Sequence, residues 1–457
     1  MEYKKEIHVL IIWSEATCVK EEILEIVNQH FKIKRIFTNS WKKDQFLTNL
    51  IPFYAHSQKE KSKKDYINLL KNKISHCGSG LFTIVVFEDQ NPIYDYRETS
   101  NGKRLVNINV FDRKKTFRNM TGGGHKIHAT DNVFESNKDL TIFFGKNTKD
   151  FCEHYQGYST IDQKSEFQCF GVVGFKNIKD LFYLLNNSID YCVLRNFECL
   201  PDKYTLEGHG DIDMLVENLN YVLYLTNAQS VFPKLNYRVH YTIKIGGEKI
   251  PFDFRYVGDN YYDNHWEIAI LESKEKFKNL INVPDNNNHF FSLLYHAYLQ
   301  KGEIKADYFV KLKKVAELNG TSYHPELNKR EVKNILDQFL AENNYCYALP
   351  KDLSVYFNSD FAFIDQAFKN NENGKEPEIL NQSEDDMFFS LPLLKISPSI
   401  YHNKESLAKK INHIRLITQN SEPNLKTLIR FYTRNSSLAN LARSFFYKLR
   451  FQLNSIL

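Results

Sequence analysis

Three aspartates occupy positions from which their carboxylates could act together. Asp211 and Asp213 flank Ile212 in the segment GHGDIDMLVEN, and Asp253 lies between two phenylalanines in KIPFDFRYV. Residues i and i+2 of a strand point to one face, so Asp211 and Asp213 are expected to converge. Two adjacent carboxylates raise each other's pKa unless a cation lies between them. The pattern therefore predicts a divalent metal site made by the three aspartates, although a solvated strand end would also explain Asp-x-Asp alone.

Mg²⁺ suits such a site, because it prefers a few carboxylates together with oxygens of a phosphate-bearing substrate. Mn²⁺ is the alternative cation. Ions held by three carboxylates would activate an attacking oxygen and stabilise a leaving phosphate. An acid between two apolar aromatics, as at Asp253, needs a partner if it is buried. Ile212 and Met214 are expected on the opposite face, against the core.

Two arginines lie close to the aspartates in the sequence. Arg195 lies near the end of the predicted strand YCVLRNF and is a candidate for bidentate phosphate binding, with a surface arginine as the alternative. Arg255 follows Asp253 at i+2 and shares its face. It is either a substrate clamp or a salt-bridge partner that keeps Asp253 ionised. His289 and His296 are seven residues apart on a predicted helix, where packing explains them as well as substrate contact does.

The order of these pieces resembles the nucleotidyltransferase (polymerase-beta-like) superfamily. A small-residue turn precedes Asp-x-Asp, a helix follows, and a later strand carries the third aspartate; the matching residues are Gly208, Gly210, Asp211, Asp213 and Asp253. The segment YCVLRNFECLP looks like the one that leads into this motif in bacterial nucleotidyltransferase-like proteins of surface-polysaccharide gene clusters. The likeness extends over about residues 170–315.

The resemblance implies a Mg²⁺-dependent (or Mn²⁺-dependent) transferase of a nucleotidyl or other phosphate-bearing group, acting in surface-glycan biosynthesis. It implies catalytic and metal-binding roles for Asp211, Asp213 and Asp253. The nucleotide and phosphate groups are then expected at Gly208, His209, Gly210, Arg195 and Arg255. The turn departs from the family pattern, because His209 stands where a serine or glycine is usual.

Three other functions remain open. A phospho-alditol transferase with a CDP-linked donor, in the manner of the LicD- and fukutin-like transferases, is mildly favoured by His209. A toxin-like nucleotidyltransferase would modify tRNA or protein, but the modest net charge of +5 does not predict a nucleic-acid partner. A non-catalytic binding protein would keep only the fold. The expected partners are a nucleotide or nucleotide-activated donor and a glycan or lipid-linked acceptor.

A glycine- and histidine-rich stretch, RNMTGGGHKIHATDN, is a candidate second site. Glycines allow close backbone approach and can form an anion-binding nest, and neighbouring basic groups would complement a phosphate. A flexible turn with ordinary polar histidines is the alternative. The candidate residues are Arg118, Gly122, Gly123, Gly124, His125, Lys126 and His128.

The elements that must position these residues indicate an α/β (α+β) protein. We expect an N-terminal α/β domain over residues 1–155, a nucleotidyltransferase-like domain with a mixed sheet over 165–285 and a helical domain over 286–370. An acidic linker over 371–394 and a basic helical tail over 395–457 follow. Strands are predicted at Ile7–Trp13, Leu81–Asp89 and Lys138–Gly145, and Gly246-Gly247 predicts a compact hairpin.

Localisation is predicted from what the chain lacks and from its tail. Seven scattered cysteines without a CxxC pair, and no long apolar run, favour a cytoplasmic protein. The tail carries eleven Lys or Arg residues from Lys395 onward, against two acids. A basic amphipathic helix there is expected to dock on the protein itself or to contact the inner face of a membrane.

Overall fold

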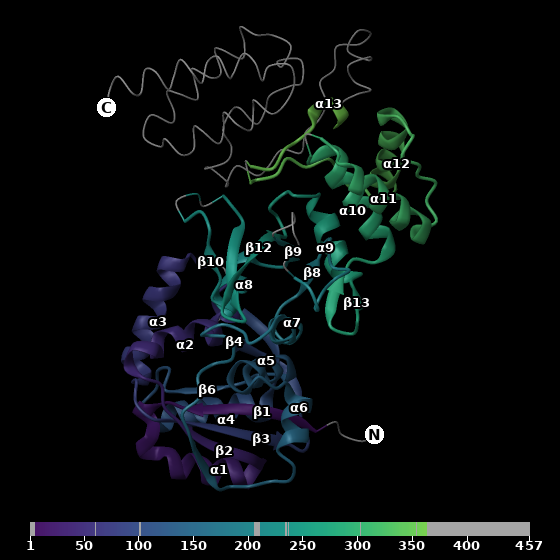
Figure 1. The fold of residues 1–457 in the computed structure, drawn as a ribbon. Helices are drawn as coiled ribbons and strands as arrows, with labels where there is room; N and C mark the ends of the chain where they lie inside the picture. Colours follow the sequence, from purple (N-terminus) through teal and green to yellow (C-terminus); the bar gives the residue numbers. More distant parts are fainter. Residues whose placement is uncertain are drawn as a thin grey trace, which may run out of the picture.

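The computed structural model describes residues 5–59, 61–99, 102–204, 211–233, 235, 237–301, 303–352 and 354–362 (Figure 1). The predicted acidic linker, the predicted basic tail and the turn residues Gly208, His209 and Gly210 lie outside this part. The chain has mixed sheets and many helices, which confirms the α/β class. Along the described residues, no helix combines the length and the apolar character needed to cross a bilayer.

The N-terminal half is built on a mixed sheet of the order β6-β1-β3-β2-β7. Its strands are β1 (Glu6–Ile12), β2 (Lys32–Asn39), β3 (Phe82–Asp89), β6 (Ile127–Ala129) and β7 (Asp162–Ser165). Only β2 and β7 run parallel among these pairs. Every residue of β3 is buried, because helices cover both faces. The predicted strands over Ile7–Trp13 and Leu81–Asp89 are confirmed.

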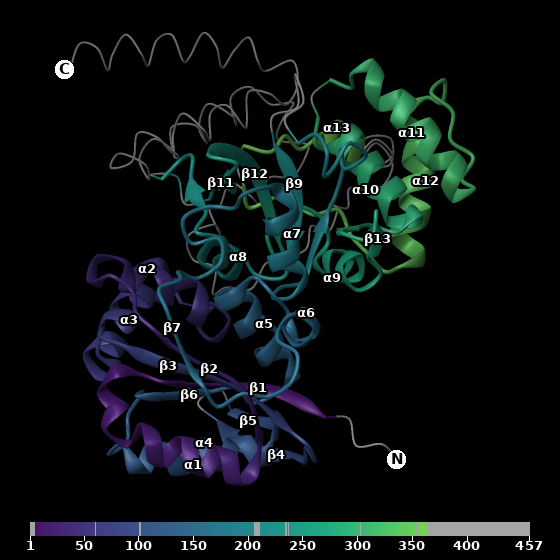
Figure 2. The same cartoon turned by 60° about the horizontal axis from the view of Figure 1, so that its bottom comes forward.

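Two layers of helices enclose this sheet (Figure 2). One face packs against α1 (Lys20–His30) and α4 (Ile108–Met120). The other packs against α2 (Lys43–Tyr54), α3 (Lys63–Cys77), α5 (Val133–Phe144) and α6 (Thr148–His154). Short connecting elements complete this half: η1 (Ser14–Val19), η2 (His56–Gln58) and the hairpin of β4 (Tyr94–Thr99) and β5 (Gly102–Asn107).

The strand predicted over Lys138–Gly145 is wrong, because these residues belong to helix α5. Asn132 caps the helix by accepting from the Glu135 amide, and Gly145 closes it in the left-handed conformation at φ 62°. A short apolar run does not by its period alone distinguish a buried strand from a buried helix. The two caps decide it here.

The second sheet has the order β10-β11-β12-β9-β8. Its strands are β8 (Tyr191–Val193), β9 (Ile212–Val216), β10 (Gln229–Ser230), β11 (His240–Ile245) and β12 (Glu248–Tyr256). The predicted hairpin is confirmed, since Gly246 and Gly247 join β11 to β12 at φ 60° and 89°. β12 lies parallel to β9, and α8 (Leu219–Thr226) starts the connection between them.

The two faces of the second sheet lie against different partners. Ile212, Met214 and Phe252 belong to one large core that includes α7 (Ile178–Asn186), α8 and the N-terminal sheet. This confirms the prediction that Ile212 and Met214 face the core. The opposite face, with Cys192 and Leu215, packs against the helical region.

The helical region consists of α9 (Asn264–Glu272), α10 (Asn286–Leu299), α11 (Ala306–Asn319), α12 (Lys329–Glu342) and α13 (Ser359–Ala362), with the small hairpin β13 (Glu275–Phe277) and β14 (Ile281–Val283). Gly320 caps α11 in the left-handed conformation. The preceding helix, α10, ends at Leu299, and Gln300 is its C-cap. All seven cysteines are free thiols.

Candidate metal centre

Strand register brings the candidate residues together on the face of the second sheet that meets the helical region. Asp253 of β12 lies opposite Asp213 of β9 in the parallel pair and opposite His240 of β11 in the antiparallel pair. Paired residues of neighbouring strands carry their side chains on the same face. Asp213, Asp253 and His240 therefore form a row across three strands.

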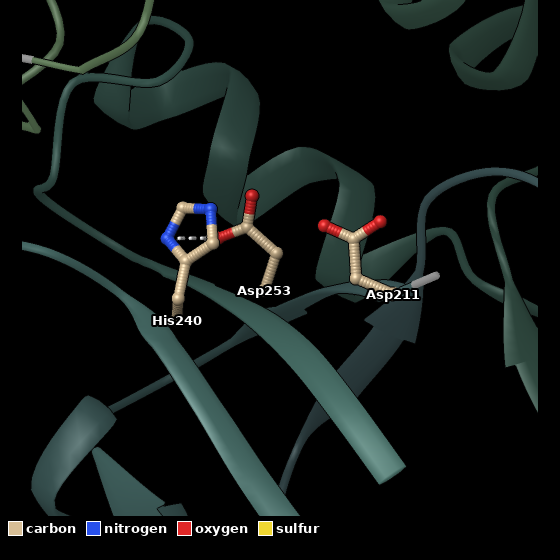
Figure 3. Close-up of side chains that lie close together, drawn as sticks. All are labelled: Asp211, His240 and Asp253. Atoms are coloured by element: carbon tan, nitrogen blue, oxygen red, sulfur yellow. Dashed lines mark ion pairs between the residues drawn. The ribbon is translucent and has the colours of Figure 1, made fainter. Parts of the chain in front are cut away.

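Asp211 completes the cluster from just before β9. One ligand atom each of Asp211, His240 and Asp253 lies within 4.8 Å of the other two. Figure 3 shows the Asp253 side chain between those of His240 and Asp211, with His240 and Asp253 facing one another. Among the described residues, this is the one group of three or more acidic, histidine or cysteine side chains arranged to hold a metal ion.

Two buried atoms of this cluster have no hydrogen-bond partner in the described part of the chain. They are Asp253 Oδ1 and His240 Nδ1, and they face one another at 4.0 Å. That separation is too long for a hydrogen bond. Metal–ligand bonds to oxygen and nitrogen are about 2.0–2.2 Å, so two ligands of one ion lie within about 4.2 Å of each other. The separation thus fits two ligands that share a cation.

Arg255 holds the other oxygen of Asp253. Its Nη2 donates to Asp253 Oδ2 at 2.8 Å, and its Nη1 lies 3.5 Å from Asp352 Oδ2. The Arg255 side chain is only 3 % exposed and stacks on the Tyr261 ring at 4.3 Å. Of the two roles predicted for Arg255, this arrangement matches the salt-bridge partner. Asp253 is thereby fixed through one oxygen while the other faces the cluster.

Asp213 and Arg195 form a second buried ion pair. Arg195 Nη2 donates to Asp213 Oδ1 at 2.5 Å and to the Tyr261 hydroxyl at 2.9 Å. Burial raises the pKa of Asp213 to about 6; the Arg195 charge opposes that rise, and the charges of Asp253 and Asp211 add to it. Arg195, predicted as a phosphate-binding residue, is therefore engaged by a carboxylate. Asp213, predicted as a metal ligand, lies beside the cluster rather than in it.

A layer of hydroxyl and imidazole groups from the helical region covers this ion pair. The Tyr261 hydroxyl lies 2.8 Å from His296 Nδ1, and His296 Nε2 lies 3.1 Å from the Tyr308 hydroxyl. Burial, reinforced by the charge of Arg195, holds the pKa of His296 well below its usual range. His289 instead packs its ring against Phe197 at 4.9 Å. The two predicted histidines thus have structural partners of their own.

Lys301 follows α10 and lies within electrostatic reach of the cluster. Desolvation and the charge of Arg195 lower the pKa of Lys301, while the charges of Asp213 and Asp211 raise it. The residue as a whole is solvent-exposed. A lysine whose charge interacts with Asp211 and Asp213 suits an anionic substrate.

The glycine- and histidine-rich stretch follows α4 in the N-terminal half. Gly122, Gly123 and Gly124 all have positive φ, at 74°, 85° and 79°. The Gly122 and Gly123 amides donate to the carbonyls of Asn119 and Arg118 at 3.1 and 2.7 Å, so they close the helix. Two of the amides that an anion nest would use are therefore already engaged.

The basic residues of this stretch contact either other side chains or backbone carbonyls. The His125 ring stacks on that of His76 at 5.9 Å, and desolvation followed by the charges of Lys73 and Arg118 lowers the pKa of His125. His128 instead pairs with buried Asp139 at 2.8 Å. Two further side chains bond to backbone carbonyls, Arg118 Nε to Ile127 at 3.3 Å and Lys126 Nζ to Thr121 at 2.9 Å.

His240, Asp352 and Tyr261 are the site residues that the sequence did not single out. The signal for His240 was present, because a two-residue turn at Gly246-Gly247 fixes the register that pairs it with Asp253. Asp352 lies about a hundred residues after Arg255, beyond four helices, and its sequence context marks no strand or motif. No local sequence pattern could have predicted the contact between Arg255 and Asp352.

A scan against models of known protein families gives no match, and neither do searches of curated proteins and of solved structures. The site therefore rests on the geometry of the chain itself.

Proposed function

We propose that the protein is a metal-dependent transferase of a nucleotidyl or other phosphate-bearing group, acting in surface-glycan biosynthesis. The observation that carries the proposal is the meeting of Asp211, His240 and Asp253 in one cluster, in which two buried ligand atoms have no partner within the described ranges of the chain. The order of Asp-x-Asp strand, helix and third aspartate strand also agrees with the superfamily that the sequence resembles. The glycan acceptor rests on that resemblance alone.

Each residue has a distinct part in this proposal. A bound divalent cation, Mg²⁺ or Mn²⁺, would polarise the phosphate and neutralise its developing charge. Asp211, His240 and Asp253 would hold it, and Arg255 would keep Asp253 oriented. Lys301 would attract the donor phosphates toward Asp211, whose charge acts on it.

The testing experiment follows radiolabelled CTP, ATP, GTP and UTP, and a CDP-linked alditol, with Mg²⁺ or Mn²⁺ and candidate acceptors. Wild-type protein is compared with Asp253→Asn and with Asp202→Asn, a carboxylate on the surface that is 71 % exposed. We expect pyrophosphate release or labelled product from wild type and Asp202→Asn. Asp253→Asn should lose at least about tenfold, because even the outer partners of metal ligands are worth 10–100-fold.

The second candidate is a metal-binding protein without transfer activity. The pairing of Asp213 with Arg195 favours it, because a carboxylate expected to take part in catalysis is engaged elsewhere. Metal binding without turnover of any of the five donors would select this candidate. Turnover of the CDP-linked compound alone would identify a phospho-alditol transferase.

A further inference from the structure

We infer that the cluster is selective for a first-row transition-metal ion such as Mn²⁺ over Mg²⁺, because His240 supplies an imidazole nitrogen to it. The inference rests on the metal site of the proposed function and specifies its metal. It concerns binding, so its test needs no turnover.

The chemistry of the three ligand atoms carries the inference. Asp211 and Asp253 offer carboxylate oxygens, and His240 offers Nδ1. Mg²⁺ is a hard cation that takes oxygen ligands and keeps several waters. Imidazole suits the later first-row transition metals, and Mn²⁺ stands at the low-affinity end of that series. Mn²⁺ is therefore the member that shows the least discrimination, and it is the probe that paramagnetic resonance can detect. A set of one nitrogen and two oxygens therefore discriminates against Mg²⁺.

The His240 ring is fixed where a ligand is needed. Its strand position opposite Asp253 sets the backbone, and its ring packs edge-on against Phe232 at 5.9 Å. The Arg238 guanidinium covers the Phe232 ring at 4.3 Å. His240 is 27 % exposed and Asp253 is 8 % exposed. The cluster is thus closed on the Asp253 side and open on the His240 side, where water or substrate oxygens could complete the coordination.

A simple salt bridge between His240 and Asp253 does not explain the arrangement. The nearest atoms, Nδ1 and Oδ1, are 4.0 Å apart, and neither has a hydrogen-bond partner among the described residues. A buried polar atom without a partner costs free energy, whereas a shared cation would satisfy both atoms.

The test uses the full chain, freed of metal, with Mn²⁺ and Mg²⁺ as the probes. Titration by electron paramagnetic resonance gives the stoichiometry and Kd for Mn²⁺, and competition gives the Kd for Mg²⁺. Electron spin-echo envelope modulation of bound Mn²⁺ detects a coordinated imidazole nitrogen directly. The variants are His240→Asn, which removes the nitrogen, and His240→Asp, which restores an all-oxygen set. His324→Asn, an exposed histidine between α11 and α12, is the matched control.

We expect one Mn²⁺ per chain, tighter than Mg²⁺, with a nitrogen coupling in wild type and His324→Asn. His240→Asn should abolish the coupling and weaken Mn²⁺ at least about tenfold, since even outer partners of a ligand are worth 10–100-fold. His240→Asp should reduce the discrimination between the two ions. If a variant does not fold, the presence or absence of the nitrogen coupling in wild-type protein tests the inference by itself.

Mn²⁺ bound without a nitrogen coupling, Mg²⁺ bound as tightly as Mn²⁺, or no binding of either ion would overturn the inference. The proposed function fails separately. Group transfer with Mg²⁺ and no nitrogen coupling would retain the function and reject the selectivity. Bound Mn²⁺ with a nitrogen coupling, but without group transfer, would support the selectivity and reject the proposed function.

Discussion

Arg195 and Asp213 close a buried ion pair at 2.5 Å, with each side chain only 8 % exposed. Asp213 neighbours Asp253 in the register of β9 and β12. The pair therefore keeps a positive charge beside a cluster of carboxylates. One oxygen of Asp213 is thereby engaged, and through Arg195 the carboxylate is linked to Tyr261.

Replacing Arg195 by Met is expected to lower the free energy of unfolding by about 3–5 kcal/mol, because Asp213 would lose its buried partner. Urea denaturation at neutral pH measures the change. Arg97→Met is the control, since Arg97 makes only surface ion pairs with Asp95 and Asp112. That change should cost far less, because exposed ion pairs contribute little to stability. Equal effects of the two substitutions would contradict a special role for the Arg195 pair.

Tyr261→Phe tests the hydroxyl that links the ion pair to the helical region. The hydroxyl accepts from Arg195 and contacts His296, so its loss leaves buried polar groups short of a partner. The expected cost is about 1–3 kcal/mol of unfolding free energy. Tyr94→Phe, whose hydroxyl donates to Glu6 near the surface, should cost less. A Tyr261→Phe protein as stable as wild type would show that water replaces the hydroxyl.

The buried acids Asp259 and Glu267 predict a dependence of stability on pH. Burial raises the pKa of Asp259 to about 6, against the opposing charge of Arg255. Burial and then the charge of Asp259 raise the pKa of Glu267 well above its usual range. A folded-state pKa above the unfolded value means that the folded protein binds the proton more tightly. This contribution is complete below about pH 4 and is lost as the pH rises through the folded values.

Glu267→Gln replaces one of these two titratable carboxyl groups by an amide that does not titrate. We expect the unfolding free energy of wild type to fall, relative to this variant, as the pH rises from about 4 to about 7. Denaturant titrations across that range give the comparison. Parallel pH profiles for the two proteins would show that the raised pKa values make no difference to folding.

Adding and removing metal should change stability without any substrate. A ligand that binds only the folded state stabilises it by about 2.7 kcal/mol at a hundred times its Kd. Mn²⁺ is therefore expected to raise the thermal midpoint, and excess chelator should reverse the rise. Asp211→Asn should show little of this shift, because it removes a ligand from the cluster. An equal shift in Asp211→Asn would place the metal elsewhere on the protein.

The sequence predicts those parts of the site in which a short-range pattern fixes the direction of a side chain. Alternation along β9 separates Met214, in the core, from Asp213, on the site face. The turn at Gly246-Gly247 fixes the β11–β12 register and with it the pairing of His240 and Asp253, although that consequence was missed.

Pairings between strands and side chains that are far apart in the chain could not be predicted from the sequence. The adjacency of β9 and β12 joins strands separated by a helix and two other strands. The engagement of Arg195 by Asp213 follows only once both side chains are enclosed by Tyr261 and its neighbours. The misassigned helix α5 shows the same limit locally, because its apolar residues fit either kind of buried element and only its caps distinguish them.

One hydrophobic core runs without interruption from the N-terminal sheet to the second sheet. Tyr66 of α3 packs on Tyr224 of α8 at 4.5 Å, and the Tyr224 hydroxyl donates to the Lys61 carbonyl at 3.0 Å. A truncated protein that contained only the second sheet and the helical region would expose this contact surface to water. The N-terminal half thus covers the face of the second sheet opposite to the candidate metal centre, and without it Ile212, Met214 and Phe252 would be exposed to water.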